Sequence, residues 1–288
     1  MFWQTTRFQI DLSQPKVMGI VNVTPDSFSD GGQFFAPGSG MASALAHCEQ
    51  LVKDGADMLD IGGESSRPGA QPLPLADELA RVLPVVRHAL TLGVAVSVDT
   101  YKPETMQAVL GLGVDIINDI WALRQPGALE AVVAHPSCGV CLMHMHREPQ
   151  TMQAEPMQGD VVAQVLAFLK QQAKLLEVLG VANNRITLDP GIGFGKTVAQ
   201  NFALLSRQSD LLAAGYPLVA GWSRKSSLAA VSSTSLELVA QMSITDRMVP
   251  SVAAAVLAVE RGARVVRVHD VRETAQALKV WTASKMSD

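Results

Sequence analysis

Polar side chains close a series of short apolar runs in this sequence, and their types are those that bind ligands. In "KVMGIVNV" Asn22 interrupts an apolar run, which then opens into a loop with Phe28 and Asp30. Later runs end in or lead into comparable groups, namely Arg67, Asp99, Asn118, Asp189, Phe194, Lys225, Ser226, Arg267 and His269. Loops held on a rigid scaffold often carry the residues that bind substrates, so these run ends are the candidates for a site.

One group of these residues suits a polyanion with a bound cation. Arg67 and Arg267 present planar forks that match phosphate oxygens. Asn22 offers an amide oxygen, which is a hard ligand suited to Mg²⁺, and His269 completes the group. These four residues therefore indicate a phosphate-bearing ligand with a magnesium ion.

A second group, Asp99, Asn118, Asp189 and Lys225, suits a flat heterocycle with many donors and acceptors. A carboxylate can accept two N–H groups from a guanidine-like ring edge, and an asparagine matches a neighbouring donor–acceptor pair. The alternative is that some of these carboxylates pair with arginines and only stabilise the fold. That alternative explains single residues more readily than the whole set.

The elements that must position these residues follow from the order of the chain. Eight short β-rich runs alternate with longer stretches in which apolar residues recur at helical spacing, and this pattern is typical of parallel βα units. We predict an α/β fold, a (β/α)₈ TIM barrel, as one domain over residues 1–288 with its core at 15–284. A doubly wound sheet is the rival, but it would need a glycine-rich dinucleotide turn after an early strand, and none is present.

The barrel fold brings the candidate residues together, because the active site of such a barrel lies at the C-terminal ends of its strands. Residues 5–14 are expected to form a short N-terminal segment that covers the bottom of the barrel. The Ser/Thr-rich stretch 226–250 predicts a loop between two helical pieces. The stretch Ser251–Gly262 is apolar on nearly every side, which predicts a helix in a homodimer interface.

Composition excludes several classes of protein. The net charge of −4 argues against a nucleic-acid partner, which usually requires a basic surplus. No apolar run reaches the roughly 18 residues that a membrane helix needs, and the first residues lack the layout of a signal peptide. Three cysteines in 288 residues make no disulfide framework, so a cytoplasmic location is expected.

Two further motifs have competing interpretations. Cys138 and Cys141 form a C-x-x-C, but they enter an apolar run that predicts a strand, so buried thiols are favoured over a redox or metal pair. His144 and His146 share a strand face and could chelate a metal, as in metal-dependent hydrolase barrels. Such enzymes usually place this pair on the first strand, which here carries Asn22, so the metal pair is the weaker interpretation.

Taken together, the motifs resemble the dihydropteroate synthase family. The matching stretches are "MGIVNVTPDSFSDGG", "DIGGESSRPGA", "SVDT", "INDI", "LMHM", "LDPGIGFGK", "SRKS" and "RVHDV", in family order and at family spacing. The resemblance implies an enzyme of folate biosynthesis that joins p-aminobenzoate to 6-hydroxymethyl-7,8-dihydropterin diphosphate and releases pyrophosphate. It further implies Mg²⁺ as cofactor, a homodimer, and a target of sulfonamides.

The resemblance also implies a role for each matching residue. The pterin ring would be held by Asp99, Asn118, Met143, Asp189 and Lys225. The diphosphate would be held by Asn22, Ser66, Arg67, Arg267 and His269, with Asn22 also at Mg²⁺. The p-aminobenzoate site would be bordered by Phe28, Ser66, Pro68, Phe194, Lys225 and Ser226, and Asp30 would order the first loop. Asp99, Asp189, Lys225 and Arg267 would be catalytic, whereas His146 and Arg147 receive no role.

One departure from the family pattern is Ser66, where many members carry threonine, so a hydroxyl is kept and a methyl is lost. Two other functions remain as alternatives. A pterin-binding barrel of the methyltransferase type, working with a corrinoid protein, does not need "SRKS" and "ESSRPGA" together. A non-catalytic paralogue would be expected to lack some motif residue, and none is missing.

Overall fold

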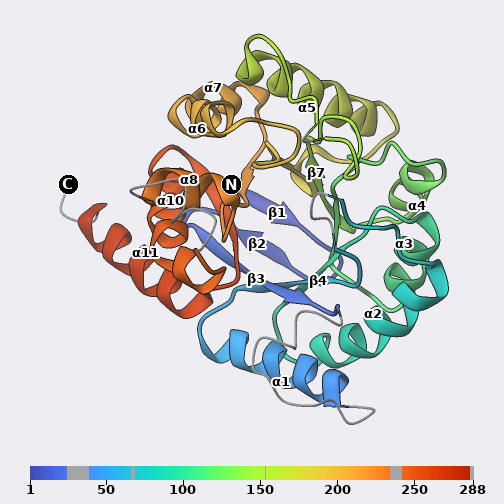
Figure 1. Ribbon diagram of the computed structural model, residues 1–288. Helices are drawn as coiled ribbons and strands as arrows, with labels where there is room; N and C mark the ends of the chain where they lie inside the picture. The colour runs from blue at the N-terminus through green and yellow to red at the C-terminus, as the bar shows by residue number, and fades with distance from the viewer. Residues whose placement is uncertain (25–38, 66–68, 153, 234–241, 286–288) are drawn as a thin grey trace.

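The computed structural model describes residues 1–24, 39–65, 69–152, 154–233 and 242–285. Eight parallel strands form a closed barrel in the order β10-β3-β4-β5-β6-β7-β8-β9. Helices surround this barrel as an outer ring, and the N-terminal strands β1 and β2 lie across its middle in this view (Figure 1). The predicted (β/α)₈ barrel is therefore confirmed.

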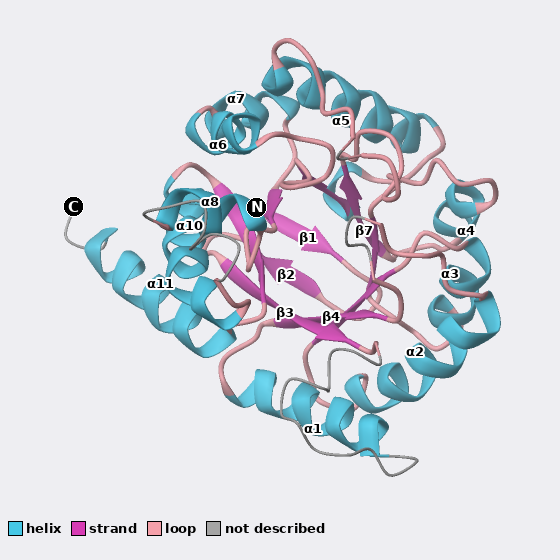
Figure 2. Ribbon diagram, in the orientation of Figure 1, coloured by secondary structure: helices cyan, strands magenta, loops and turns pink. Residues whose placement is uncertain are grey.

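The elements alternate along the chain as the sequence predicts, and Figure 2 shows strands inside and helices outside. The strands are β1 (Phe2–Gln4), β2 (Gln9–Asp11), β3 (Lys16–Asn22), β4 (Met58–Gly62), β5 (Ala95–Asp99), β6 (Ile116–Asp119), β7 (Gly139–Met143), β8 (Ile186–Asp189), β9 (Leu218–Ala220) and β10 (Ala263–Val268). The α-helices are α1 (Ser39–Lys53), α2 (Leu75–Ala89), α3 (Pro103–Leu110), α4 (Ala128–Ala134), α5 (Val161–Val178), α6 (Val198–Ser206), α7 (Gln208–Leu211), α8 (Ser226–Ser232), α10 (Met248–Glu260) and α11 (Val271–Lys285). Short 3₁₀ helices are η2 (Asn183–Arg185), η3 (Leu212–Ala214) and η4 (Thr245–Arg247).

Local sequence explains where several helices begin. Helix α5 follows Asp160, whose carboxylate accepts N–H groups from Val162 and Ala163. Helix α6 follows Thr197, which forms a capping box with Gln200. These caps satisfy N–H groups that the first helical turn leaves without partners, so they fix the points where the chain leaves the loops above the barrel.

The register of the barrel places the candidate residues at one level. Asn22 at the end of β3 pairs with Gly62 of β4, and Gly62 pairs with Asp99 of β5. Asp99 in turn pairs with Asn118 of β6. On the other side Met143 of β7 pairs with Asp189 of β8. Because the strands are parallel, all of these residues lie at the C-terminal ends of their strands.

The opposite end of the barrel is closed by the N-terminal hairpin. Strands β1 and β2 pair antiparallel, and Trp3 in β1 is fully buried. Trp3 and Leu12 pack against residues that begin or line the barrel strands, including Met58 and Ile116. The predicted covering segment is confirmed, although its first strand begins at Phe2 and thus precedes the predicted range 5–14.

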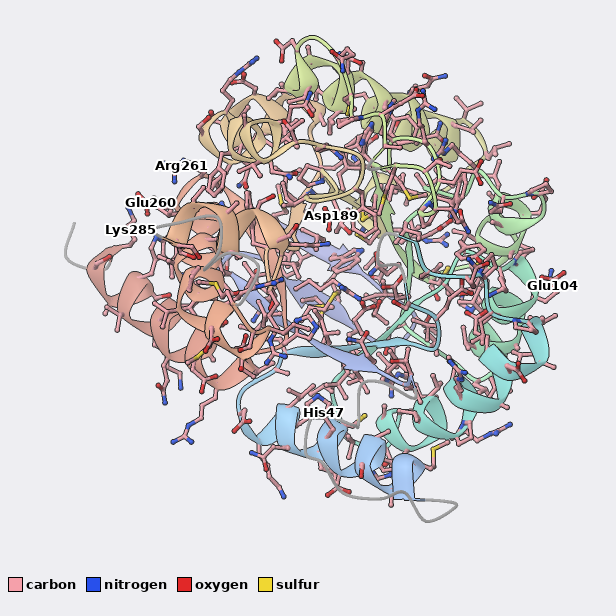
Figure 3. The ribbon with its side chains drawn as sticks, in the orientation of Figure 1. His47, Glu104, Asp189, Glu260, Arg261 and Lys285 are labelled. Atoms are coloured by element: carbon pink, nitrogen blue, oxygen red, sulfur yellow. The ribbon has the colours of Figure 1, made fainter. Side chains whose placement is uncertain are left out.

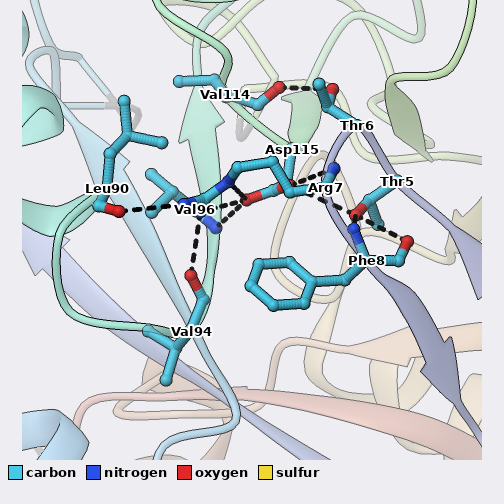
Figure 4. Close-up of polar contacts among 9 residues, drawn as sticks. All are labelled: Thr5, Thr6, Arg7, Phe8, Leu90, Val94, Val96, Val114 and Asp115. Atoms are coloured by element: carbon cyan, nitrogen blue, oxygen red, sulfur yellow. Dashed lines mark hydrogen bonds and ion pairs between the residues drawn. The ribbon is translucent and has the colours of Figure 1, made fainter.

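One buried carboxylate fastens the hairpin to the barrel (Figure 4). Asp115 accepts hydrogen bonds from the Arg7 guanidinium, from the Arg7 backbone and from the Val96 backbone. The Arg7 guanidinium also donates to the carbonyls of Leu90 and Val94, at 2.9 Å and 3.0 Å. The Arg7 guanidinium therefore satisfies two backbone acceptors at the bottom of the barrel as well as the buried carboxylate.

The predicted apolar helix corresponds to α10, which begins at Met248, ahead of Ser251. One face of α10 packs against β10 and α11, while Val249 and Leu257 on α10 are 71% and 43% exposed. Helix α8 ends at Ser232 and η4 precedes α10. Residues 234–241 of the predicted loop lie outside the described part of the chain. In the parts of the chain that the structure describes, no helix is both long and apolar enough to cross a membrane.

Candidate active site

Arg267 lies at the centre of an ion network at the C-terminal end of the barrel. Its Nε donates to Asp60 Oδ2 at 2.5 Å, and its terminal nitrogen donates to Asp99 Oδ2 at 2.7 Å. Asn118 donates from its amide nitrogen to the same Asp60 oxygen at 3.1 Å. Strands β4, β5, β6 and β10 thus each contribute one side chain to a single polar cluster.

Asp60 is a site residue that the sequence reasoning missed. Its side chain is fully buried in β4, and its Oδ1 has no hydrogen-bond partner among the described residues. A buried acceptor without a partner costs free energy, so its presence at the centre of this cluster points to a ligand donor. The signal was available in "DMLDIGG", where an acid stands inside an otherwise apolar strand.

Asp99, Asp189 and Lys225 act on one another electrostatically. Burial raises the pKa of Asp99 to about 7, although the Arg267 guanidinium opposes this shift. Burial also raises the pKa of Asp189, and the nearby Lys225 and Arg267 oppose that rise. Burial and the Arg267 charge lower the pKa of Lys225 to about 8. Asp99, Asp189 and Lys225 therefore lie close together around Arg267, and each carboxylate has a cation nearby.

Asp189 also shapes the loop that follows β8. Its Oδ1 accepts the N–H of Gly191 at 2.7 Å. Gly191 has a φ of +68°, and a Cβ on it would lie 1.8 Å from the carbonyl oxygen of His144, so only glycine fits. The loop carries Phe194, whose ring centre lies 4.2 Å from the Lys225 Nζ. Figure 3 shows Asp189 inside the ring of helices, whereas Glu104 and Glu260 lie at its outer edge.

Asn22 and His269 face each other across the junction of β3 and β10. The Asn22 amide nitrogen lies 3.5 Å from His269 Nε2, and His269 Nδ1 lies 3.0 Å from the Ser223 hydroxyl. With its nitrogen toward the imidazole, Asn22 leaves its amide oxygen for a cation. Within the described ranges no cluster of three or more His, Cys, Asp or Glu is placed to hold a metal. The amide oxygen of Asn22 fits Mg²⁺, because this ion commonly binds few protein oxygens and completes its coordination with water and substrate phosphate.

The remaining predicted residues divide into two sets. Met143 is buried beside Phe194 in a small apolar cluster, and Ser226 is exposed at the start of α8. The residues of the first two loops lie outside the described part of the chain, namely Phe28, Asp30, Ser66, Arg67 and Pro68. Every described member of the predicted set therefore lies at the C-terminal end of the barrel.

A cavity of about 210 Å³ opens next to Asp99. Its lining includes Glu64, Tyr101, Trp121 and Pro149, so it combines aromatic surface with carboxylates. Glu64 is held by the Tyr101 hydroxyl at 2.7 Å and by the Lys102 ammonium. The site thus has room for a small molecule directly beside one of its central acids.

Some polar strand ends have structural partners instead. Arg224 pairs with Asp270 at 2.7 Å, and Asp119 accepts the N–H groups of Trp121 and Leu123. The arginine–carboxylate pairing that the sequence left open is therefore present at Arg224. It is also present at Arg267, but the carboxylates that Arg267 contacts belong to the site.

The two ambiguous motifs are also resolved by their surroundings. Cys138 and Cys141 are buried free thiols, which confirms the favoured interpretation, although Cys138 lies just before β7. His144 is buried with its Nδ1 3.0 Å from Lys196 Nζ, so that ring nitrogen faces an amine.

Comparison with known proteins identifies the family. A family model described as pterin binding enzyme matches residues 18–269. The chain is 48% identical over 283 residues to the dihydropteroate synthase of Neisseria meningitidis serogroup C, covering 98% of this chain and 96% of that protein. The chain belongs to the dihydropteroate synthase family.

Solved dihydropteroate synthases share the whole fold. The enzyme of Xanthomonas albilineans with 4-aminobenzoic acid has a TM-score of 0.88 and 44% identity, with 99% of each chain covered. The enzyme of Burkholderia cenocepacia complexed with 7,8-dihydropteroate has a TM-score of 0.87 and 46% identity, with 99% of this chain and 97% of that chain covered. At this identity and coverage the likeness extends well beyond the barrel architecture.

Proposed function

We propose that this chain condenses 6-hydroxymethyl-7,8-dihydropterin diphosphate with p-aminobenzoate, giving 7,8-dihydropteroate and pyrophosphate. The observation that carries the proposal is one polar cluster around Arg267, formed by Asp60, Asp99, Asn118, Asp189 and Lys225. The family of the chain and its structural relatives with 4-aminobenzoic acid and with 7,8-dihydropteroate support it.

The pterin ring is held by the acids of the pocket in this proposal. Asp99 and Asp189 accept N–H groups from the ring, Asn118 matches a donor–acceptor pair, and Lys225 donates. Asp60 joins them, because its free Oδ1 supplies the acceptor that the cluster leaves open. Met143 packs near the ring, since it is buried at the end of β7 beside this pocket.

The diphosphate lies on the other side of Arg267. Asn22, Arg267 and His269 bind it from the described strand ends, with Ser66 and Arg67 completing the set by family resemblance. The Asn22 amide oxygen would hold Mg²⁺ together with diphosphate oxygens. When bound, Mg²⁺ supplies positive charge that stabilises the departing pyrophosphate.

The arylamine binds above Lys225. Phe194 and Ser226 border its site together with Lys225, whose Nζ lies over the Phe194 ring. Phe28, Ser66 and Pro68 complete this border and Asp30 orders the first loop, again by family resemblance.

The reaction depends on the leaving group more than on a base. The arylamine is neutral and nucleophilic at pH 7, so it needs no deprotonation before attack. The bond from the pterin methylene carbon to the diphosphate oxygen breaks, and its electron pair leaves with pyrophosphate. The amine nitrogen then bonds to that carbon and releases one proton to water. Asp99 and Asp189 stabilise positive charge on the pterin, and Arg267 stabilises negative charge on the leaving group.

Two further properties belong to the proposal. A homodimer forms through α10, because Val249 and Leu257 expose apolar surface on a helix whose other face packs in the barrel. A cytoplasmic location is supported by the three cysteines, which are all free thiols.

The test is a product assay. The purified protein is incubated with 6-hydroxymethyl-7,8-dihydropterin diphosphate, p-aminobenzoate and Mg²⁺, and 7,8-dihydropteroate is measured by mass spectrometry. We expect product only when both substrates are present. A folded protein that binds the pterin diphosphate but forms no product would instead indicate the non-catalytic alternative.

A further inference from the structure

Lys196 is a buried lysine that is not among the residues proposed to bind the substrates. It lies in the loop between β8 and α6 and is only 2% exposed. Its Nζ donates to the carbonyl oxygens of Gly191 at 2.8 Å and Phe194 at 3.1 Å. The same nitrogen lies 3.0 Å from His144 Nδ1, and 3.4 Å from the His144 carbonyl oxygen.

These contacts fix both ends of a short segment of the site. Gly191 is held to Asp189 through its N–H, and Phe194 supplies the ring that lies beneath Lys225 Nζ. Lys196 therefore ties the backbone next to a pterin-side acid to the backbone of an arylamine-side aromatic residue. His144 at the end of β7 anchors the lysine to the barrel.

A lysine is a costly choice for this position. Burial lowers the pKa of Lys196 to about 7, and the nearby Lys225 charge acts in the same direction. A purely apolar contact could be filled by methionine, which has no charge to bury. The amine group is thus explained by the carbonyl oxygens of Gly191 and Phe194 that it holds.

A second tie holds the same loop from the side. Asn201 of α6 accepts the N–H of Gly193 at 2.8 Å and donates to the Ser227 hydroxyl at 2.9 Å. Ser227 adjoins Ser226 at the start of α8, so the loop is connected to the segment that carries Lys225. Phe194 consequently has a defined place relative to Lys225 before any ligand arrives.

We propose that Lys196, anchored by His144, is a positioning residue for the p-aminobenzoate site, because it fixes the loop that presents Phe194 to Lys225. This inference rests on the proposed function, in which Phe194 and Lys225 border that site. His144 of "LMHM" and Lys196 of "GFGK" would then act together on one loop, which neither motif indicates alone.

The test uses the full-length enzyme and the variant Lys196→Met, which keeps side-chain length and removes the donors. We expect the KM for p-aminobenzoate to rise about tenfold, the factor of a lost charge-assisted hydrogen bond. The KM for the pterin diphosphate should change much less, because Asp99 and Asn118 lie on other strands.

Gln208→Met is the matched control. Gln208 is also buried, and its amide donates to the carbonyls of Ala258 at 2.7 Å and Arg261 at 3.1 Å, away from the site. We expect a lower melting temperature with both KM values unchanged. A merely structural role for Lys196 would give this same result, and that outcome would overturn the inference.

If circular dichroism shows that Lys196→Met does not fold, His144→Leu is used in its place. We expect the KM for p-aminobenzoate to rise in this variant too, by a smaller factor, with little change in the KM for the pterin diphosphate. If the wild type is active and the folded variant has an unchanged KM for p-aminobenzoate, the inference is overturned and the proposed function stands. An inactive wild type overturns the proposed function, and the inference with it.

Discussion

Arg267 donates to Asp99 at 2.7 Å, so a cation proposed for the diphosphate contacts an acid proposed for the pterin. The two halves of the substrate thus meet at one ion pair. Because Arg267 also holds Asp60, its loss would leave two carboxylates at the centre of the barrel without their cation. The residue should matter for the fold and for the reaction, and the two effects can be separated.

The first prediction concerns turnover by Arg267 variants. Arg267→Ala should lose about 1.5–3 kcal/mol of transition-state stabilisation, the value of a charge-assisted hydrogen bond, and kcat should fall accordingly. Arg267→Lys keeps the charge but not the planar fork, so an intermediate kcat is expected. Melting curves of both variants serve as the control for folding. Wild-type turnover by Arg267→Ala at saturating substrates would contradict the assignment.

The second prediction concerns the pH dependence of pterin binding. Because burial raises the pKa of Asp99 to about 7, its carboxylate is protonated more and more as pH falls below 7. A protonated carboxyl accepts the ring N–H groups less well, so affinity for a pterin analogue should weaken between pH 7 and pH 5. Calorimetry of the wild type and of Asp99→Asn measures this, and the variant should show a flatter profile.

The raised pKa of Asp99 also affects the free energy of unfolding, which changes with pH in the opposite direction to pterin affinity. Asp99 has a higher pKa folded than unfolded, so the folded state binds more protons between its ordinary pKa and about 7. Its contribution to the free energy of unfolding should therefore decrease as pH rises through that window. The difference between wild type and Asp99→Asn in urea unfolding isolates this contribution. A difference that grows in favour of the wild type with rising pH would be evidence against the raised pKa.

The third prediction concerns assembly. Val249 on α10 and Val178 on α5 are exposed to nearly the same extent, at 71% and 73%. Val249→Asp should place a charge in the proposed interface and give a monomer, whereas Val178→Asp should remain dimeric. Light scattering at micromolar protein measures both. A wild-type monomer, or two variants with equal mass, would count against an interface at α10.

The fourth prediction concerns the hairpin at the barrel bottom. Asp115→Ala removes the acceptor of Arg7 and of the Val96 N–H, and should lower the free energy of unfolding by about 3 kcal/mol. Asp210→Ala removes an exposed partner of Arg207 and should change stability little. Urea denaturation compares the two variants. Equal losses of unfolding free energy in the two variants would show that the Asp115–Arg7 contact stabilises the fold no more than a surface ion pair.

The sequence was sufficient for the barrel because each βα unit carries a local signal. Apolar runs and helical periodicity mark the elements, and the parallel arrangement then places Asp99, Asn118 and Asp189 at one end without further information. The predicted bounds of the N-terminal segment were less accurate. Strand Phe2–Gln4 is stabilised by packing against the barrel, and this packing leaves no periodic signal in the local sequence.

Pairing across the barrel could not be predicted in the same way. Asp60 and Arg267 are 207 residues apart, and nothing local to either indicates the 2.5 Å contact between them. The contact of Lys196 with His144 is hidden for the same reason, because it joins the loop after β8 to the end of β7. Such contacts depend on which side chains face one another once the barrel has closed.

The central claim is that the site stabilises the departing pyrophosphate and does not activate the amine. Pyrophosphate release at saturating substrates is the direct measurement, made with a series of ring-substituted p-aminobenzoates of different basicity. We expect rates that hardly change across the series, because the bond to the leaving group breaks ahead of attack. A rate that rises steeply with amine basicity would contradict it.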